Sequence, residues 1–453
     1  MSLPKPSSCL GCPFYGNGSG FVPDELRDGA AVLVYGQNPG KEEELEAKPF
    51  VGKTGQMMET KFFPLAGLTR DQVSIGNAYR CRVNGKNDLP ELQSIEARVA
   101  LEHCTKAHRV IPPGTKLIVT QGAYALYAMT GEGLGKDRTI SSWRGWLLPQ
   151  QARVPDLEPA GLEPGKQSII YTPQPGDVPV LATLHLAALF HDPHMQIPTK
   201  RDWQKVQRIL AGKWPEPMPP IQVLPPASWP ASAAFDTEFN RYTKELTRYS
   251  LAWRYDHPHV YVVEAADAHR IESLVVPRPT VILQNAWADI PYLDKLLPGG
   301  YELEDTMLAD ACLWSDLPND LDFLGSQSAR TNRWKHLVES NELVYSGADA
   351  LATWDVWQEQ AKQFARDPVL EKEIYRGRML PLIPIIARAH TEGMRVDCEA
   401  AKKALEQLEA LLGDHTVRAQ ASVGWPLNLG STPQVQKQLY EIEGLKVKRG
   451  GWR

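Results

Sequence analysis

The densest run of prolines in the chain lies between Trp214 and Pro230, in the sequence WPEPMPPIQVLPPASWP. Proline has no N–H to donate to a β-ladder, and it restrains the residue before it toward extended backbone. We therefore expect a semi-rigid interdomain spacer at 214–230 rather than a helix or a central strand. The spacer divides a chain of 453 residues into parts that are each long enough to bury a core.

The residues before the spacer alternate short apolar runs with helical patterns. Strands are expected at 31–35, 73–77, 116–120 and 179–185, and helices at 54–65, 89–108 and 124–130. Strands that alternate with helices predict a parallel sheet covered on both faces. A stretch rich in Pro, Gly and Gln, 149–177, is expected to be a surface insertion.

The residues after the spacer begin with a second set of strand patterns, near 233–236, 248–253, 259–264 and 281–285. From about residue 371 the pattern changes to long helices, at 380–390 and 399–412. The expected fold class is therefore α/β and multi-domain, with a helical segment at the end. The predicted domains are 1–213, 231–368 and 369–453, joined at 214–230 by the spacer.

The net charge of the chain is −5, so contact with nucleic acid would have to come from local basic patches. No apolar run is long enough to span a bilayer, and the first residues do not resemble a signal peptide. We expect an intracellular protein of the cytoplasm that has no membrane partner.

Four of the six cysteines lie in the first quarter of the chain, and Cys9 and Cys12 form a C-x-x-C pair. Together with Cys81 and Cys104 they supply four thiolates. That number suits either a tetrahedral zinc site or one [4Fe–4S] cluster, and the cysteine pattern alone leaves both open.

The apolar run AVLVY, at 31–35, leads directly into the glycine-containing loop Gly36–Gly40. Glycine lets backbone approach a ligand closely, and a loop after a parallel strand lies at the usual ligand-binding edge of such a sheet. By itself this loop is weak evidence, because most such loops are only tight turns.

Four motifs in the residues before the spacer resemble the uracil-DNA glycosylase superfamily, most closely its iron–sulfur type, family 4. They are GQNPGKEEELEAKPFVGKTGQMM, SIGNAYRCRVNGKN, LIVTQGAYAL and LATLHLAAL, and the resemblance covers about residues 5–212. It implies an α/β/α sandwich and a [4Fe–4S] cluster on the four cysteines. By the same resemblance, Phe50 would stack on a flipped uracil and Asn77 would read the Watson–Crick edge of that base. His185 would stabilise the charge on the departing uracil anion.

The resemblance also implies a role for the loop after the first strand, in which Gly36 and Gln37 would cradle the base and Asn38 would position the attacking water. Gln37 stands where the iron–sulfur type usually has Glu, and Leu186 stands where it usually has Pro. The GxNPG form instead resembles the mismatch-specific and single-strand-selective branches. The alternative is a domain that keeps the fold and the cluster without excising bases.

Acidic residues of the second block lie on separate elements. Asp236 and Glu238 are two apart on a strand and so share one face, and Asp289 follows another strand. Tyr345 and Asp349 are four apart and so share one face of a helix. Four acids that converge repel one another unless cations lie between them, which is what a two-metal phosphodiester site requires.

The order of the motifs DTE, NAWAD and YSGAD resembles the DEDD 3′–5′ exonucleases, in the tyrosine subtype that proofreads for family A DNA polymerases. The resemblance covers about 231–365 and implies a ribonuclease-H-like fold. It also implies that Asp236, Glu238, Asp289 and Asp349 hold two Mg²⁺ or Mn²⁺ ions. Tyr345 would orient the attacking water, and the substrate would be a single-stranded or frayed 3′ end of DNA.

The last block resembles the segment that follows the exonuclease in family A polymerases, through GMRVD at 393–397 and NLGSTPQVQKQL at 428–439. These motifs correspond to the base of the thumb. No palm or fingers motifs follow, so this chain alone is not expected to synthesise DNA. The expected partner is a polymerase palm and fingers, in the same longer protein or in a separate chain, with the basic run 446–449 as part of the docking surface.

Taken together, the sequence predicts a replication and repair protein of a bacterium or a bacterial virus. Its expected activity is a metal-dependent 3′–5′ exonuclease, joined to a uracil-glycosylase-like domain that acts on DNA containing uracil. One alternative is a non-catalytic scaffold that presents DNA to a partner polymerase. The other is a stand-alone uracil-repair enzyme that also trims ends.

Overall fold

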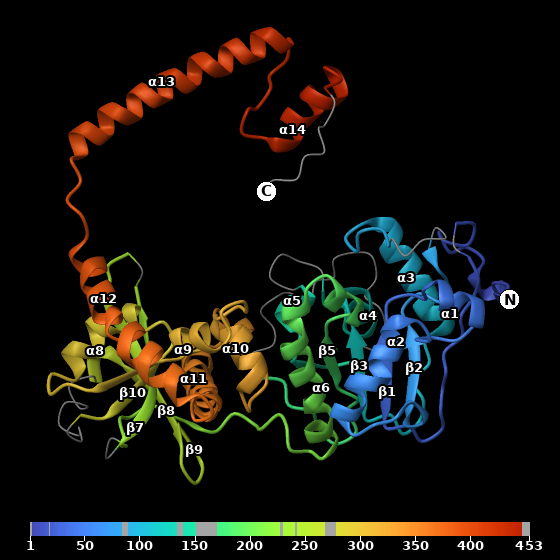
Figure 1. Ribbon diagram of the computed structural model, residues 1–453, viewed down its shortest axis with the longest axis horizontal. Helices are drawn as coiled ribbons and strands as arrows, with labels where there is room; N and C mark the ends of the chain where they lie inside the picture. Colours follow the sequence, from blue (N-terminus) through green and yellow to red (C-terminus); the bar gives the residue numbers. More distant parts are fainter. Residues whose placement is uncertain are drawn as a thin grey trace. The chain divides into compact units, whose positions relative to one another are not determined.

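A computed structural model describes residues 2–17, 19–83, 89–133, 139–150, 170–226, 230–240, 242–267 and 278–445 (Figure 1). Most of the expected insertion at 149–177 and the basic run 446–449 lie outside the described residues. The chain divides into two compact units, residues 1–387 and residues 388–453. None of the helices that are described has both the length and the apolar character needed to cross a membrane.

The first sheet has the strand order β2-β1-β3-β5-β4. The four strands β2, β1, β3 and β5 are parallel, and only β4 runs antiparallel to its neighbour. Their bounds are β1 Val32–Gly36, β2 Val73–Asn77, β3 Leu117–Gln121, β4 Leu147–Leu148 and β5 Val180–Thr183. The predicted parallel sheet is thereby confirmed.

Helices cover both faces of the first sheet, as the uninterrupted apolar runs of its strands require. Val32 and Val34 pack on one face with Trp203 of α6, whereas Leu33 and Tyr35 pack on the other face with α3 and α4. The helix bounds are α1 Lys41–Glu46, α2 Lys53–Met57, α3 Ile95–His108, α4 Ala123–Thr130, α5 Ile140–Trp143 and α6 Gln196–Leu210. Helix α3 begins later than its sequence pattern suggested, because the Ser94 side chain accepts the Ala97 N–H as its N-cap.

The second sheet has the strand order β11-β10-β7-β8-β9-β6 and is mixed. Strands β7, β8 and β9 are antiparallel neighbours, and β7, β10 and β11 are parallel. The bounds are β6 Ile221–Gln222, β7 Ser232–Phe239, β8 Leu246–Arg254, β9 Pro258–Glu264, β10 Thr280–Leu283 and β11 Glu302–Asp305. The edge strand β6 comes from the proline-rich segment, which therefore pairs with β9 as well as joining the two sheets.

The long helix α11 packs across β7, β8 and β9 (Figure 1). This helix, α11, spans Glu342–Phe364. The other helical elements of this part are α8 Ile290–Leu296, α9 Thr306–Leu313, α10 Leu321–Ser328, a π-helical segment Leu370–Met379 and α12 Leu382–Glu392. Tyr375 and Ile383 are buried against Trp357 and Phe364 of α11. Residues well beyond 368 thus contribute to the core of the second sheet.

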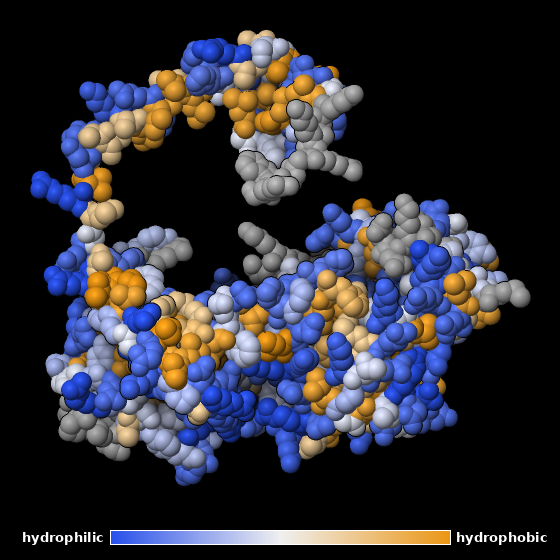
Figure 2. Space-filling view, viewed as in Figure 1, coloured by the Kyte–Doolittle hydropathy of each residue, from blue (hydrophilic) through white to orange (hydrophobic). Residues whose placement is uncertain are grey.

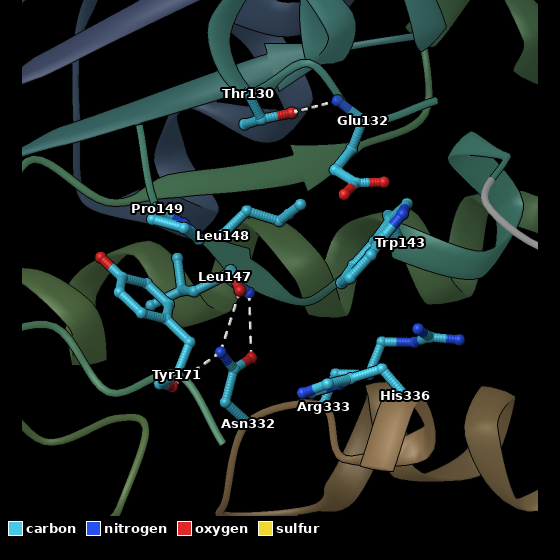
Figure 3. Close-up of a pocket in the computed structure, with 10 residues that line it drawn as sticks. All are labelled: Thr130, Glu132, Trp143, Leu147, Leu148, Pro149, Tyr171, Asn332, Arg333 and His336. Carbon is cyan, nitrogen blue, oxygen red and sulfur yellow. Dashed lines mark hydrogen bonds between the residues drawn. The ribbon is translucent and has the colours of Figure 1, made fainter. Parts of the chain in front are cut away.

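Residues on either side of the spacer share one buried apolar cluster, which includes Trp146 and Trp203 of the first part and Leu324 and Trp334 of the second. Trp146 and Trp334 meet edge to face, with their ring centroids 5.8 Å apart. Asn332 reaches across to the first part, where it accepts the Leu147 N–H at 3.0 Å and donates to the carbonyl oxygens of Leu147 and Tyr171, both at 2.9 Å (Figure 3). The two sheets of residues 1–387 are therefore joined by a packed and hydrogen-bonded interface.

The second unit consists of α13 Cys398–Val423, α14 Thr432–Gln436 and a short π-helical segment, Lys437–Ile442. Asp397 caps α13 by accepting the N–H groups of Glu399 and Ala400. No residue of α13 is buried among those described, and its apolar residues gather along one side of the helix (Figure 2). Leu405, Leu408 and Leu412 are more than half exposed.

Candidate functional site

Three of the acids that the sequence singled out meet at the end of the second sheet. Asp236 and Glu238 project from β7, and Asp349 lies on the second turn of α11. Carboxylate oxygens of the three residues all lie within 4.8 Å of one another. The fold therefore brings together side chains that are more than 100 residues apart in the sequence, as the exonuclease motifs predicted.

The fourth acid, Asp289, is held differently. It caps α8, and it accepts hydrogen bonds from the Thr237 N–H, at 3.1 Å, and from the Thr237 hydroxyl. The pKa of Asp236 is raised, mainly by burial and then by the charges of Asp349, Asp289 and Glu238. Asp289 thus lies outside the group of three oxygens but within electrostatic reach of it.

Hydrogen bonds balance the charges of this acidic site only in part, and Asp236 is the member that lacks them in the part of the chain that the structure describes. Asp236 Oδ2 is buried and has no donor among the described residues. Burial raises the pKa of Glu238 and raises that of Asp289 to about 7. A buried carboxylate oxygen without a donor, among like charges, is the environment that divalent cations fill in proteins, so the donor set fits Mg²⁺ or Mn²⁺.

Two residues of this site, Trp334 and Lys335, were not anticipated from the sequence. Lys335 donates to Asp349 Oδ1 at 2.6 Å and to the Tyr345 hydroxyl at 3.3 Å. Burial alone would lower the pKa of Lys335, but the charge of Asp349 outweighs it and the pKa is raised. The Trp334 indole N–H donates to the same Asp349 oxygen. No periodicity marks this pair, because their role depends on how the loop before α11 folds back.

Burial and the charge of Asp349 raise the pKa of Tyr345 to about 12. The hydroxyl therefore keeps its proton at neutral pH, and it lies one helical turn from Asp349. A protonated phenol beside gathered carboxylates can both accept from and donate to a water molecule.

The first sheet brings the predicted base-binding residues together at the carboxyl ends of its strands. Gly36 ends β1 and is paired with Asn77, the last residue of β2. A Cβ atom on Gly36 would lie 2.5 Å from Asn77 Oδ1 and 2.5 Å from Phe50 Cζ. Only glycine lets these two side chains approach the strand end so closely.

Phe50 has a left-handed backbone, with φ of 53°. Arg70 donates to the carbonyl oxygens of Pro49 and Phe50, at 2.6 and 2.8 Å, and a Cβ atom on Gly55 would collide with the Phe50 carbonyl. A non-glycine residue is strained in this conformation and keeps it only where its surroundings require it. The structure therefore fixes the direction of the Phe50 ring.

His185 follows β5, and its ring centroid lies 6.5 Å from that of Phe50. Its Nδ1 accepts the Ala187 N–H at 3.2 Å, so the proton of the neutral ring resides on Nε2. Burial lowers the pKa of His185 to about 4. A neutral imidazole that offers Nε2–H is therefore the stable form of this residue at neutral pH.

Gln37 and Asn38, the other two predicted residues of the loop after β1, contact neighbouring backbone. The Gln37 side chain packs against Gly122, where a Cβ atom would lie 2.8 Å from Gln37 Cδ. Asn38 Nδ2 donates to the Pro39 carbonyl at 3.2 Å, and both side chains are half-buried. The predicted role of Asn38 in positioning water stays a prediction.

All four predicted ligand cysteines line one small cavity of about 20 Å³, and none of them forms a disulfide. Burial raises the pKa of Cys81 to about 11 and that of Cys104 to about 12, and it also raises those of Cys9 and Cys12. Buried thiols that face one cavity fit a metal centre, because bound metal ions supply the positive charge that keeps thiolates ionised.

The spacing of the sulfur atoms bears on which centre this is. Sulfur atoms about 2.3 Å from a single zinc ion would lie about 3.8 Å from one another. Among the described residues, the metal-ligating groups that gather within 4.8 Å are Asp236 with Glu238 and Asp349, and the exposed set of Asp256, His257 and His259. No three of the four cysteines are among these groups, so the sulfur positions by themselves select neither zinc nor a [4Fe–4S] cluster.

Curated relatives that carry the name type-4 uracil-DNA glycosylase match the first part of the chain. The protein of Sulfurisphaera tokodaii is 26% identical over 45% of this chain and 80% of its own length. The protein of Archaeoglobus fulgidus is 25% identical over 46% and 91%. The protein of Thermotoga maritima is 30% identical over 34% and 77%.

Solved structures resemble the chain only distantly. The POL domain of Pol1 from M. smegmatis, in complex with a DNA primer-template and dNTP, is 18% identical over 49% of this chain and 38% of its own, with a TM-score of 0.35. The apo form of a nuclease is 16% identical over 36% and 85%, with a TM-score of 0.29. Neither score establishes a shared fold.

The family profile described as uracil DNA glycosylase superfamily matches residues 23–210, which carry Gly36, Phe50, Asn77 and His185. Through these residues, the chain belongs to the uracil DNA glycosylase superfamily.

Proposed function

We propose that this chain is a DNA-processing enzyme with two active sites, a metal-dependent 3′–5′ exonuclease on the second sheet and a uracil-DNA glycosylase site on the first. The observation that carries the exonuclease is the gathering of Asp236, Glu238 and Asp349 within 4.8 Å. We further propose, from the motifs, the domain bounds 1–213, 231–368 and 369–453, with 214–230 between them; residues 370–387 belong to the last of these by motif but pack in the core of the second sheet.

Asp236, Glu238, Asp289 and Asp349 would hold two Mg²⁺ or Mn²⁺ ions, which when bound supply positive charge to the attacking and leaving oxygens of a phosphodiester. The buried Asp236 oxygen that lacks a donor supports this assignment. Tyr345, protonated and one turn from Asp349, orients the attacking water. Lys335 fixes the positions of the Tyr345 hydroxyl and of Asp349 through its two hydrogen bonds.

The substrate would be a 3′ end that is single-stranded or frayed, because a terminal nucleotide must leave the base stack to reach buried carboxylates. The test is degradation of a 5′-labelled oligonucleotide by the whole protein with and without Mg²⁺. We expect stepwise shortening that EDTA abolishes and that is faster for a single strand than for a paired end. A labelled strand that keeps its full length in Mg²⁺ and in Mn²⁺ would refute the exonuclease and favour the non-catalytic scaffold.

The glycosylase site would act through neutral groups. The tautomer fixed by Ala187 directs Nε2–H of His185 outward as a donor, which can stabilise negative charge on a departing uracil. Asn77 offers both a donor and an acceptor to the edge of the base, and Phe50 offers a face for stacking. The approach of Asn77 and Phe50 to Gly36 brings the amide and the ring to the same strand end, which supports this assignment.

The glycosylase is tested with an oligonucleotide that contains one uracil, incubated in EDTA so that the exonuclease is silent. We expect abasic sites, revealed as breaks by alkali, and a loss of at least about 10²-fold in rate for His185→Ala. If the wild-type protein forms no abasic sites, the first sheet serves DNA binding rather than base excision.

The four cysteines would hold a [4Fe–4S] cluster, as the resemblance to the iron–sulfur type implies, and the cavity that all four thiols share supports a metal centre there. Protein purified without oxygen is expected to absorb broadly in the visible and to contain iron. Cys81→Ala should lose that absorption. A colourless protein that contains stoichiometric zinc would overturn the assignment.

The exposed apolar side of α13 supports a partner for the last unit. By the resemblance of this segment to the thumb base, we propose that the partner is a polymerase palm and fingers, in the same longer protein or in a separate chain, and that this chain alone does not synthesise DNA. Leu408→Glu with Leu412→Glu should abolish co-elution with a separately produced palm and fingers. Unchanged co-elution would contradict this surface.

A further inference from the structure

A large open pocket of about 540 Å³ lies between the two sheets of residues 1–387, remote from the motifs of both sites. One wall is the face of α6 that carries Arg201, Lys205 and Arg208, and the other wall is formed by the last turn of α11, with Lys362, and by the turn after it, with Arg366. Because these residues recur at helical spacing, each wall presents a row of side chains rather than a single one. The pocket is thus an open channel between two helices.

The pocket is basic although the chain as a whole carries a net charge of −5. Six Lys or Arg residues line it, against two Glu residues. Both glutamates are already paired: Glu216 with Arg254 at 2.6 Å, and Glu359 with Lys362 at 2.6 Å. An excess of positive charge therefore remains for an anion from outside the protein.

Two cations, one on each wall, are free to receive that anion. Arg208 and Arg366 are exposed, and their side chains form no ion pair with any described residue. Arg201 and Arg208 are seven residues apart, which places them about 10.5 Å apart along α6. A ligand that followed α6 would therefore need negative charges about 10 Å apart, and one that also reached Arg366 would need a further charge for the other wall.

The floor of the pocket is rigid. Lys205 donates to the carbonyl oxygens of Gly145, at 2.6 Å, and Ser326, at 2.7 Å, so it joins the two sheets rather than waiting for a ligand. Gln327 Oε1 is buried beside it with no donor among the described residues. Arg201 covers the Trp314 ring, and the Trp314 N–H is bound to Gln363, so the only aromatic residue in the lining is not free to stack on a base.

We propose that this pocket binds the sugar–phosphate backbone of a DNA strand, as a third DNA contact separate from the two active sites. Two rows of cations without a free aromatic ring suit phosphates rather than bases, so the binding is independent of sequence. The choice of DNA as the polyanion rests on the proposed DNA-processing function.

The test measures binding of the whole protein to a labelled, uracil-free single strand with a blocked 3′ end, by fluorescence anisotropy in EDTA, over a series of salt concentrations. Arg208→Glu with Arg366→Glu should weaken binding. Loss of two phosphate contacts should reduce the slope of log K against log salt by about 1.4. Lys116→Glu with Lys372→Glu makes the same change of charge on exposed lysines away from the pocket and should leave the slope unchanged.

Arg208→Lys with Arg366→Lys keeps the charge and should retain most of the binding, which separates loss of contact from loss of fold. The competitors are unlabelled DNA, deoxythymidine monophosphate, and an oligoglutamate with the same net charge as the DNA strand. An unchanged slope in the Glu variant, or competition by the mononucleotide or the peptide as strong as that by DNA, would overturn the proposal. Because the assay needs neither metal nor uracil, inactive exonuclease or glycosylase sites would leave its result unaffected.

Discussion

The two sites lie in equivalent places, at the carboxyl ends of strands in two sheets, but their electrostatics are opposite. On the first sheet, Asn77 is uncharged and His185 is held neutral by burial, which lowers its pKa to about 4. On the second sheet, burial and mutual repulsion raise the pKa values of Asp236 and Glu238. One site offers fixed dipoles, and the other offers charges that need a counter-ion.

This difference teaches what each site requires before it can work. Fixed dipoles stabilise developing charge without reorganising, so the proposed glycosylase site would be complete as folded. Gathered carboxylates cost free energy until cations bind, so the proposed exonuclease site would be completed only by its metals. The two proposed activities should therefore respond differently to the same perturbations.

Removing one carboxylate should have the largest effect. Asp349→Asn takes away a charge that the gathered oxygens share, and we expect exonuclease activity to fall by about 10³-fold or more. The release of uracil should not change, because no glycosylase residue contacts Asp349. End-label degradation and abasic-site formation on the same preparations measure the two. Equal loss of both activities would contradict the separation of the sites.

Lys335→Met tests the residue that the sequence did not reveal. The variant keeps the length of the side chain but loses both hydrogen bonds and the charge beside Asp349, and we expect about a 10²-fold fall in the exonuclease kcat. Lys335→Arg should restore part of the rate. A rise in KM with kcat unchanged would show that Lys335 contacts substrate rather than positioning Tyr345 and Asp349.

Lowering the pH from about 8 to about 6 at limiting Mg²⁺ should reduce the rate of the exonuclease, relative to that of the glycosylase, by about tenfold. The pKa of Asp289 is about 7 without metal, so protons compete with metal below that value, whereas His185 stays neutral throughout the range. A pKa raised by folding stabilises the metal-free protein at low pH, and this contribution is lost as the pH rises through 7. The increase in Tm on adding Mg²⁺ should therefore be larger at pH 8 than at pH 6.

The smallest effect should come from the interface. Asn332→Ala leaves buried backbone groups of Leu147 and Tyr171 without partners, and we expect the free energy of unfolding to fall by about 1–3 kcal/mol. Urea denaturation measures this loss, and Asn17→Ala, at an exposed turn, is the matched control. Equal stability of the two variants would mean that the interface is not needed for the fold.

The regular parts of this fold were predictable because burial makes their sequence patterns simple. A strand buried on both faces is an unbroken apolar run, so the strands at Val32–Gly36 and Leu117–Gln121 were located to within a residue or two. Glu302–Asp305 was not predicted as a strand, because three of its four residues are charged and its register is set by β10. The two-residue strand at Ile221–Gln222 lies among prolines and has no pattern of its own.

The same limit applies to the sites. Spacing on one element is visible in sequence, so Asp236 with Glu238 and Tyr345 with Asp349 could be paired in advance. The hydrogen bond from Lys335 to Asp349 connects a loop to a helix, and its geometry exists only after the chain has folded. The contact of Trp146 with Trp334 likewise depends on two folded parts meeting.

That indole pair has a consequence for the handling of this protein. Trp334 donates to Asp349 from one side and packs on Trp146 from the other, so a side chain of the first part of the chain supports one of the gathered carboxylates of the second sheet. A gene trimmed to encode only the second sheet would leave Trp334 and Leu324 facing water. A shortened protein of that kind is therefore expected to lose part of the support of Asp349.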